Sequence, residues 1–391
     1  MPNSTNGPTA PRMANNVYHP CVHLFTSYWT GSQVTTAAAA IKKLVLGSSD
    51  APTFYEGPNG QAQLAVQTEF IPTEFSSHSK VADALALLDQ RLDALFETGL
   101  AVHLLLPVHQ LPVQGWQGVD WQGLAAAWPG STFVPYQPSL TKLTNGTEGP
   151  YDVLAEYFHQ PIIEHLVETG RAEKLAVIYL MNEFGYPSNT ILDNASYWGN
   201  VPNWKAVRAE ALRKTAARNL KSARKAAQGK VPVGIKFAQV TSPNTGWTPF
   251  PGDTDQLEKI LNLMAKSKDL LSYDLYFNDS DLYDPANKER FDPFLPMFLN
   301  GYFEIAEMGR LCQGCPGEFS SGARTSATDI TGSAEYWSEA KGLNLFAWNA
   351  SGCDQGCFAL ADDNNTPYPG ADKEVAGLMD LILTATGNDS C

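Results

Sequence analysis

The sequence of 391 residues predicts a single (β/α)8 barrel, an α/β fold in which eight parallel strands are each followed by a helix. Three observations predict it. From about residue 22, short apolar runs rich in β-branched and aromatic residues alternate with longer amphipathic runs. Eight such short runs can be counted. Two of the segments that follow them are much longer than ordinary connections, as in barrels with long βα loops on one face.

The expected strands span residues 22–29, 64–70, 100–108, 175–184, 231–240, 270–277, 302–309 and 343–350. The amphipathic runs predict helices over 81–97, 153–168, 207–228, 256–266 and 334–341, and a final helix over 373–384. An open doubly wound sheet is the alternative. It normally has a glycine-rich phosphate loop after its first strand, and the segment TSYWTGSQ at that place is not such a loop.

The two long segments, 109–151 and 185–206, each follow an expected strand and should therefore lie on the C-terminal face of the barrel. They are rich in aromatic residues, which either pack the loops themselves or line a cleft for a ligand with apolar faces. Sugar rings present such faces to indole and phenol rings. The aromatic residues in question are Trp116, Trp121, Trp128, Tyr136, Tyr186, Tyr197, Trp198 and Trp204.

The composition is that of a core-forming globular protein, with 43% hydrophobic and 17% charged residues. The net charge of −14 argues against a nucleic-acid partner, which needs a clustered positive field, and the basic run 208–230 is expected to be an exposed helix face. No run of 18 apolar residues predicts a membrane span. Residues 1–16 are expected to form a disordered lead, followed by one folded domain over 17–391.

Cysteine usage favours disulfide bonds, which in turn indicate a secreted, extracellular protein. Cys21 precedes the first expected strand and Cys391 follows the last helix, so closing a barrel makes these two a candidate bridge. The other four can pair locally or between the regions after strands seven and eight, or they can hold a structural zinc ion instead. The six cysteines are Cys21, Cys312, Cys315, Cys353, Cys357 and Cys391.

Two carboxyl groups stand at the ends of strands that should be buried. The fourth expected strand ends with Asn182 and Glu183, and the seventh carries Glu307 three positions after Glu304. Strict alternation along a strand places Glu304 and Glu307 on opposite faces. Because barrels hold catalytic groups at strand C-termini, Glu183 and Glu307 are expected at one site. The alternative is that both pair with basic residues of the barrel, chiefly Lys236.

Such a pair of carboxyl groups is what cleavage of a glycosidic bond requires. One protonates the leaving oxygen while the other stabilises or attacks the anomeric carbon. Burial and a nearby like charge can raise the pKa of the acid, so that it is protonated near neutral pH.

In these residues the chain resembles clan A of the glycoside hydrolases, whose barrels carry an Asn-Glu pair ending the fourth strand and a Glu ending the seventh. The matching motifs are YLMNEFG, with Asn182 and Glu183, and IAEMG, with Glu307. The resemblance implies that Glu183 is the general acid/base and Glu307 the nucleophile. It implies that Asn182 contacts the sugar 2-hydroxyl.

The resemblance also implies substrate contacts at other strand ends. Tyr276 matches an aromatic residue that touches the nucleophile, and Trp348 matches the tryptophan under the sugar beside the cleaved bond. Trp29 and His109 stand at the ends of strands one and three, where such enzymes often place substrate contacts. For Trp29, Tyr276 and Trp348 the alternative is ordinary packing in the barrel core.

The chain departs from the clan A pattern in two places. Several families have an arginine near the end of the second strand, where this chain has Gln67 and Glu69. Phe184 and Gly185 follow the Asn-Glu pair instead of the common proline. These departures leave the family within the clan and the sugar unassigned.

The sequence therefore predicts a glycoside hydrolase that cleaves a β-linked glycan with net retention, through a covalent intermediate on Glu307. No cofactor is required, and no histidine spacing indicates a catalytic metal. The expected partner is an oligo- or polysaccharide, and a monomer is expected. The alternatives are a transglycosylase that uses the same residues and a carbohydrate-binding barrel without catalysis.

Overall fold

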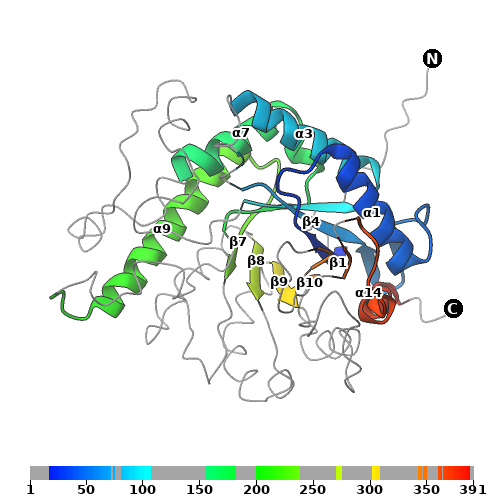
Figure 1. The fold of residues 1–391 in the computed structure, drawn as a ribbon. Coiled ribbons are helices and arrows are strands. Elements are labelled where there is room, and N and C mark those ends of the chain that lie inside the picture. The colour runs from blue at the N-terminus through cyan, green and yellow to red at the C-terminus, as the bar shows by residue number, and fades with distance from the viewer. Residues whose placement is uncertain are drawn as a thin grey trace.

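The computed structural model is a closed barrel of parallel strands with helices around it (Figure 1). The residues that it describes are 17–71, 74, 81–106, 155–181, 200–237, 270–274, 302–308, 342–345, 347–349, 360–362 and 364–387. The expected lead over residues 1–16 lies outside them, and the first strand begins at Val17.

Eight strands in the described part form the barrel, and each pairs in parallel with the next. The ring closes because β1 also pairs in parallel with β10, where Val22 lies opposite Leu345. Each expected strand overlaps an observed one, so the predicted fold is confirmed. The barrel strands are β1 (Val17–Leu24), β4 (Ala65–Glu69), β5 (Ala101–Leu105), β6 (Val177–Tyr179), β7 (Val233–Phe237), β8 (Leu270–Asp274), β9 (Tyr302–Met308) and β10 (Gly342–Leu345).

Alternate residues of the strands belong to two different cores. Val66 and Val102 are part of the large cluster that also contains the buried side chains of the surrounding helices. Their neighbours Ala65 and Ala101 are part of a smaller cluster inside the barrel. Because both faces of the strands are buried, the strands are continuous apolar runs, which is why the sequence shows them so clearly.

The first strand begins earlier than the sequence predicts. It starts at Val17, so Cys21 lies within β1 and not before it. The Cys21 side chain is fully buried in the cluster inside the barrel. The start of the strand escaped prediction because His19 and Pro20 interrupt its apolar pattern, and proline is rare inside a sheet.

Helices cover the outside of the barrel, and α3 (Val81–Glu97) shows why. Its buried residues Leu85, Leu88, Leu92 and Leu95 recur every three or four positions and form one apolar stripe. The expected helices over 81–97, 153–168, 207–228 and 373–384 are observed, and those over 256–266 and 334–341 lie outside the described residues. The remaining helical elements are α1 (Gly31–Leu46), η2 (Ala155–His159), α7 (Gln160–Glu168), η3 (Ala172–Lys174), α9 (Trp204–Ala227) and α14 (Ala371–Thr386).

A β-hairpin of β2 (Phe54–Gly57) and β3 (Gly60–Gln63) extends the sheet at the beginning of β1. The C-terminal end of α14 packs on its turn, where the Asn59 N–H donates to the Thr386 carbonyl oxygen at 3.1 Å. A Cβ atom on Gly57 would lie 2.0 Å from the same oxygen, so a side chain does not fit there. The hairpin thus connects the first strand of the barrel with its last helix.

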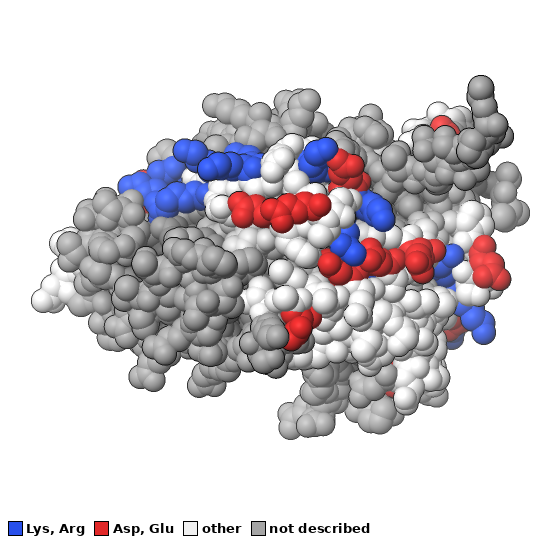
Figure 2. Space-filling view, turned by 90° about the horizontal axis from the view of Figure 1, so that it is seen from above, with Lys and Arg blue, Asp and Glu red and all other residues white. Residues whose placement is uncertain are grey.

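Helix α9 contains the basic run of the sequence and begins at Trp204, so the preceding long segment ends earlier than expected. Lys221 and Lys225 are exposed on it, and Arg213 forms an ion pair with Glu210. Figure 2 shows basic and acidic side chains in neighbouring rows on the face seen from above, so this surface has mixed charge. Among the described helices, none is long and apolar enough to cross a membrane.

Candidate active site

The candidate active site is the edge of the barrel where the strands end. The arrowheads of β7, β8 and β9 point to the same side in Figure 1, and barrels hold catalytic groups at this end. Of the residues that the sequence predicts for the site, Asn182, Glu183, His109 and Tyr276 lie outside the described residues, Glu307 is described in its backbone, and Trp29 and Trp348 are described fully.

The chain before the Asn-Glu pair stays in the barrel wall up to its last described residue. The Leu180 N–H donates to the Gly234 carbonyl at 3.0 Å, and the Lys236 N–H donates to the Met181 carbonyl at 3.3 Å. These bonds join the end of β6 to β7. β6 itself ends at Tyr179, and Asn182 and Glu183, which the sequence places at the end of this strand, lie outside the described residues.

The seventh strand of the barrel, β9, is irregular at the predicted nucleophile. Glu304 pairs with Ser272 of β8, and Glu307 pairs with Asp274, so the four residues 304–307 of β9 lie opposite the three residues 272–274 of β8. The register of β9 against β10 shifts in the same region. An irregularity of this kind interrupts the alternation of faces. Alternation in a regular strand would place Glu304 and Glu307 on opposite faces, but it does not apply across this register shift.

The turn after β1 carries two neighbouring aromatic residues. Trp29 is partly buried against the large core, and its backbone N–H donates to the Thr26 carbonyl at 2.9 Å. Tyr28, which the sequence did not single out, is 49% exposed and has a φ angle of 64°. A left-handed backbone is uncommon for so bulky a residue and indicates that its surroundings hold the turn in place.

Trp348 is a core residue in this structure. Its side chain is fully buried within the large cluster, and its indole N–H donates to Asn365 Oδ1 at 3.0 Å. Its backbone N–H donates to the His23 carbonyl of β1 at 2.7 Å. The ring therefore supports the barrel wall between β10 and β1 and presents no exposed face to a ligand.

Glu69 is the last residue of β4, and its side chain is buried at the strand end. Its carboxyl oxygen Oε1 accepts a hydrogen bond from Ser27 Oγ at 2.6 Å. Burial raises the pKa of Glu69 to about 7, and the charge of Glu74 acts in the same direction. The Ser27 hydrogen bond and the cations Arg91 and Lys236 oppose the rise. Glu69 therefore changes between its neutral and charged forms near neutral pH.

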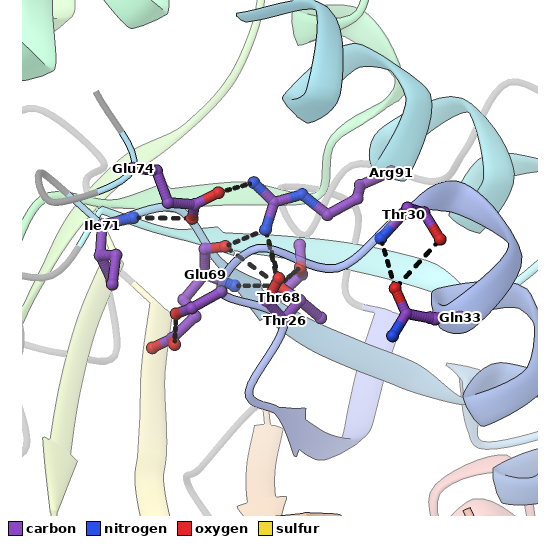
Figure 3. A network of polar contacts seen from close by, with 9 residues as sticks. Thr26, Thr30, Gln33, Thr68, Glu69, Ile71, Glu74 and Arg91 are labelled. Carbon is purple, nitrogen blue, oxygen red and sulfur yellow. Dashed lines mark hydrogen bonds and ion pairs between the residues drawn. The ribbon is translucent and has the colours of Figure 1, made fainter. Parts of the chain in front are cut away.

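A buried ion pair holds the turn after β1 (Figure 3). Arg91 of α3 lies 2.6 Å from Glu74, and both side chains are almost fully buried. The Arg91 guanidinium also donates to the Thr26 carbonyl at 2.5 Å, and Glu74 accepts a hydrogen bond from the Tyr28 backbone. In Figure 3 the carboxyl group of Glu69 points away from this ion pair. The network thus fixes the turn without using the Glu69 side chain.

Further polar side chains lie inside the barrel on the same strands. A ring nitrogen of His23 lies 2.6 Å from Gln67 Nε2, and His19 Nδ1 lies 3.0 Å from His103 Nε2. Burial, with a smaller contribution from His103, holds the pKa of His19 well below its ordinary value, so this ring is neutral at pH 7. Among the described residues, no group of three or more His, Cys, Asp or Glu side chains could hold a metal ion.

Ser27 and Glu69 were not among the predicted site residues. In the sequence, Glu69 was noted only because several clan A families have an arginine near the end of the second strand, where this chain has Gln67 and Glu69. A signal was present, because a glutamate at the end of the buried run LAVQTEF is the same kind of feature that identified Glu183 and Glu307.

Several solved structures share this fold. The exo-β-1,4-mannosidase of Opitutaceae bacterium strain TAV5 has a TM-score of 0.54 and 14% sequence identity, over 94% of this chain and 60% of the mannosidase chain. A β-glycosidase has a TM-score of 0.53 and 13% identity, over 92% of this chain and 87% of its own. The catalytic domain of β-amylase from Paenibacillus polymyxa has a TM-score of 0.53 and 11% sequence identity, over 95% of this chain and 99% of its own.

This likeness agrees with the barrel described above and with the fold expected from the resemblance to clan A glycoside hydrolases. The chain spans about 60% of the length of the mannosidase. No protein-family model matches the sequence, and no curated protein matches it either. Because the similar structures are named for different activities, their common fold does not define the sugar.

Proposed function

We propose that this protein is a retaining glycoside hydrolase that cleaves a β-linked glycan, with Glu183 as acid/base and Glu307 as nucleophile. The observation that carries the proposal is the position of two motifs in the barrel. The chain after the fourth strand stays bonded to β7 up to Met181, the residue before the Asn182-Glu183 pair in the sequence, and Glu307 lies near the end of the seventh strand. Because barrels hold catalytic groups at the C-terminal ends of their strands, we expect both motifs at this edge. The likeness to solved glycosidases supports the same class of reaction.

In the proposed reaction, neutral Glu183 donates its proton to the leaving oxygen while the Glu307 carboxylate attacks the anomeric carbon. Glu183, now a carboxylate, then takes a proton from the water that cleaves the glycosyl-enzyme bond. Two inversions at the same carbon give net retention, which requires the two carboxyl groups to lie about 5 to 5.5 Å apart. The reaction needs no cofactor.

The proposed substrate contacts come from the strand ends around this pair. Asn182 binds the sugar 2-hydroxyl, and Tyr276 lies beside the nucleophile, both as the resemblance implies. His109 and Trp29 add contacts after the third and first strands. Trp348 supports the wall of the site from within the core, because its ring is fully buried.

A hydrolysis screen tests the proposal. The purified protein is expected to cleave at least one of β-glucan, mannan, xylan and galactan, and early proton NMR spectra of that reaction should show the β anomer of the product first. An α anomer formed first would contradict retention. No cleavage of any β-linked substrate would contradict the proposed function, and larger products formed with an added acceptor sugar would indicate transglycosylation.

We also propose that the protein is secreted and contains disulfide bonds, because it has six cysteines. The expected bridge between Cys21 and Cys391 assumed that Cys21 precedes the first strand. Cys21 instead lies within β1 and is fully buried in the cluster inside the barrel, so barrel closure does not favour this bridge. The other four, Cys312, Cys315, Cys353 and Cys357, lie with Cys391 outside the described residues.

Non-reducing peptide mapping of the native protein is expected to recover Cys312, Cys315, Cys353 and Cys357 in cross-linked peptides. Alkylated thiols at all four positions would contradict these disulfides. Zinc bound in stoichiometric amount would replace them with a metal site.

A further inference from the structure

Glu69 stands at the edge of the barrel where we propose the catalytic pair, yet the reaction described above does not use it. It is the last residue of β4, the strand next to β1. Ala65 of this strand belongs to the cluster inside the barrel, and Glu69 follows it by four residues, so the two share a face. A carboxyl group is therefore buried at the inner side of the barrel mouth.

Only one of the two carboxyl oxygens of Glu69 accepts a hydrogen bond from a described residue. Ser27 Oγ donates to Oε1 at 2.6 Å, and among the described residues nothing donates to Oε2. The carboxyl group of Glu69 points away from the ion pair of Arg91 and Glu74 (Figure 3). Arg91 instead donates to the Thr26 carbonyl in the turn after β1. Oε2 is not among the sealed polar atoms of the described core, so a ligand at the mouth of the barrel can reach it.

The donor to Glu69 is held in a fixed position. Thr26, the residue before Ser27, receives a hydrogen bond from Arg91 at its carbonyl, and its hydroxyl lies 2.7 Å from the Thr68 hydroxyl. Tyr28, the residue after Ser27, is held in the left-handed conformation. Side chains fixed in this way before a ligand arrives are typical of binding sites.

We propose that Glu69 is a specificity-determining residue that binds a hydroxyl group of the sugar substrate through Oε2, with Ser27 orienting its carboxyl group. The ligand is a sugar because this inference rests on the proposed function. It adds a third carboxyl group to the two that carry out the reaction.

The protonation state of Glu69 sets the direction of this hydrogen bond. Its pKa is raised to about 7 by burial. In the part of the chain that the structure describes, the charged groups that act on it are Glu74 after β4, Arg91 on α3 and Lys236 on β7, while β1 offers the uncharged Ser27. Because the raised pKa keeps the carboxyl group neutral below about pH 7, it donates to the sugar there. Above about pH 7 the carboxylate can only accept a hydrogen bond, and covering its charge with the bound sugar costs desolvation, so the sugar should bind more weakly there.

Binding to a variant that cannot cleave the substrate tests this inference. Glu183→Gln removes the titration of the acid/base, and calorimetry then measures the binding of β-linked gluco-, manno- and xylotetraose between roughly pH 5 and 9. The affinity for the tetraose that binds best is expected to fall about tenfold as the pH rises through 7, the effect of one buried hydrogen bond.

Two further changes, each made in the Glu183→Gln protein, assign this fall to Glu69. Glu69→Gln keeps a neutral group of the same shape and should retain the high affinity over the whole pH range. Ser27→Ala removes the hydrogen bond that lowers the pKa of Glu69, so the fall should move to higher pH. Glu56→Gln, the same chemical change at an exposed residue of the hairpin, should leave the profile unchanged.

The inference is overturned if Glu69→Gln shows the same fall as its parent, if Ser27→Ala leaves the fall in place, or if none of the three sugars binds. Thermal unfolding of each variant confirms that it is folded. Hydrolysis tests the proposed catalytic function separately. The protein could bind sugars through Glu69 without cleaving them, or cleave them without this pH dependence of binding, and the two experiments distinguish these outcomes.

Discussion

Replacing Glu307 with Gln is expected to lower the turnover number on the cleaved glycan by about 10⁴-fold or more, because an amide cannot attack the anomeric carbon. Glu183→Gln is expected to lower it by roughly 10²- to 10⁴-fold, because the leaving oxygen loses its proton donor. Steady-state kinetics on the purified variants measures both effects, and thermal unfolding checks that each variant is folded.

Glu304→Gln is the matched control, since it makes the same change three residues away on the same strand. It is expected to retain activity of the same order as the unaltered protein. An inactive Glu304→Gln together with an active Glu307→Gln would show that the nucleophile is the other glutamate of β9. If Glu183→Gln and Glu307→Gln both kept full activity, the proposed function would be wrong.

Replacing Arg91 with Met is expected to destabilise the fold by about 3 to 5 kcal/mol, the usual cost of removing one partner of a buried ion pair. Glu74 is left buried without its counter-charge, and the Thr26 carbonyl loses its donor. The free energy of unfolding in denaturant at about pH 8 measures this cost. A variant within about 0.5 kcal/mol of the unaltered protein would show that the network is not needed for stability.

The cost of Arg91→Met should depend on pH. Burial raises the pKa of Glu74, and Arg91 opposes that rise, so the pKa is higher still without Arg91. A carboxyl group whose pKa is higher in the folded state than in the unfolded state stabilises the fold at low pH and loses this effect as the pH rises. The deficit should therefore be smaller at about pH 5 than at about pH 8. Adding Glu74→Gln should recover part of the loss, because no buried charge then remains unpaired.

The barrel could be predicted from the sequence because its strands are buried on both faces. Runs such as 100–108 and 175–184 contain almost only apolar residues, and each coincides with an observed strand. Helix α3 was predicted with its observed bounds because its apolar stripe is regular. The beginning of β1 could not be predicted in this way, because polar side chains inside the barrel, among them His19, interrupt its pattern.

The candidate site could be predicted only where one residue and its place on a strand were enough. Asn182, Glu183 and Glu307 were predicted from strand ends alone; of these, only the backbone of Glu307 is described. The register shift at Glu307 depends on the pairing of β9 with both of its neighbours, which no local pattern in the sequence records. The role of Glu69 depends on Ser27, which is 42 residues away in the chain and meets it only when β1 and β4 pair.

Closure of the ring between β1 and β10 has a consequence for synthesis on the ribosome. β1 is made first among the barrel strands and gains β4 early, but its other edge stays open until β10, the last strand of the barrel, has been made. The hairpin pairs with Val17 and Tyr18 on the same edge as β4, so it leaves that other edge uncovered. An open strand edge with apolar faces is prone to pair with other chains, and contacts between distant parts of a chain form slowly. During translation, the first strand of this barrel therefore has to remain unpaired on one side until every other strand of the barrel has been made.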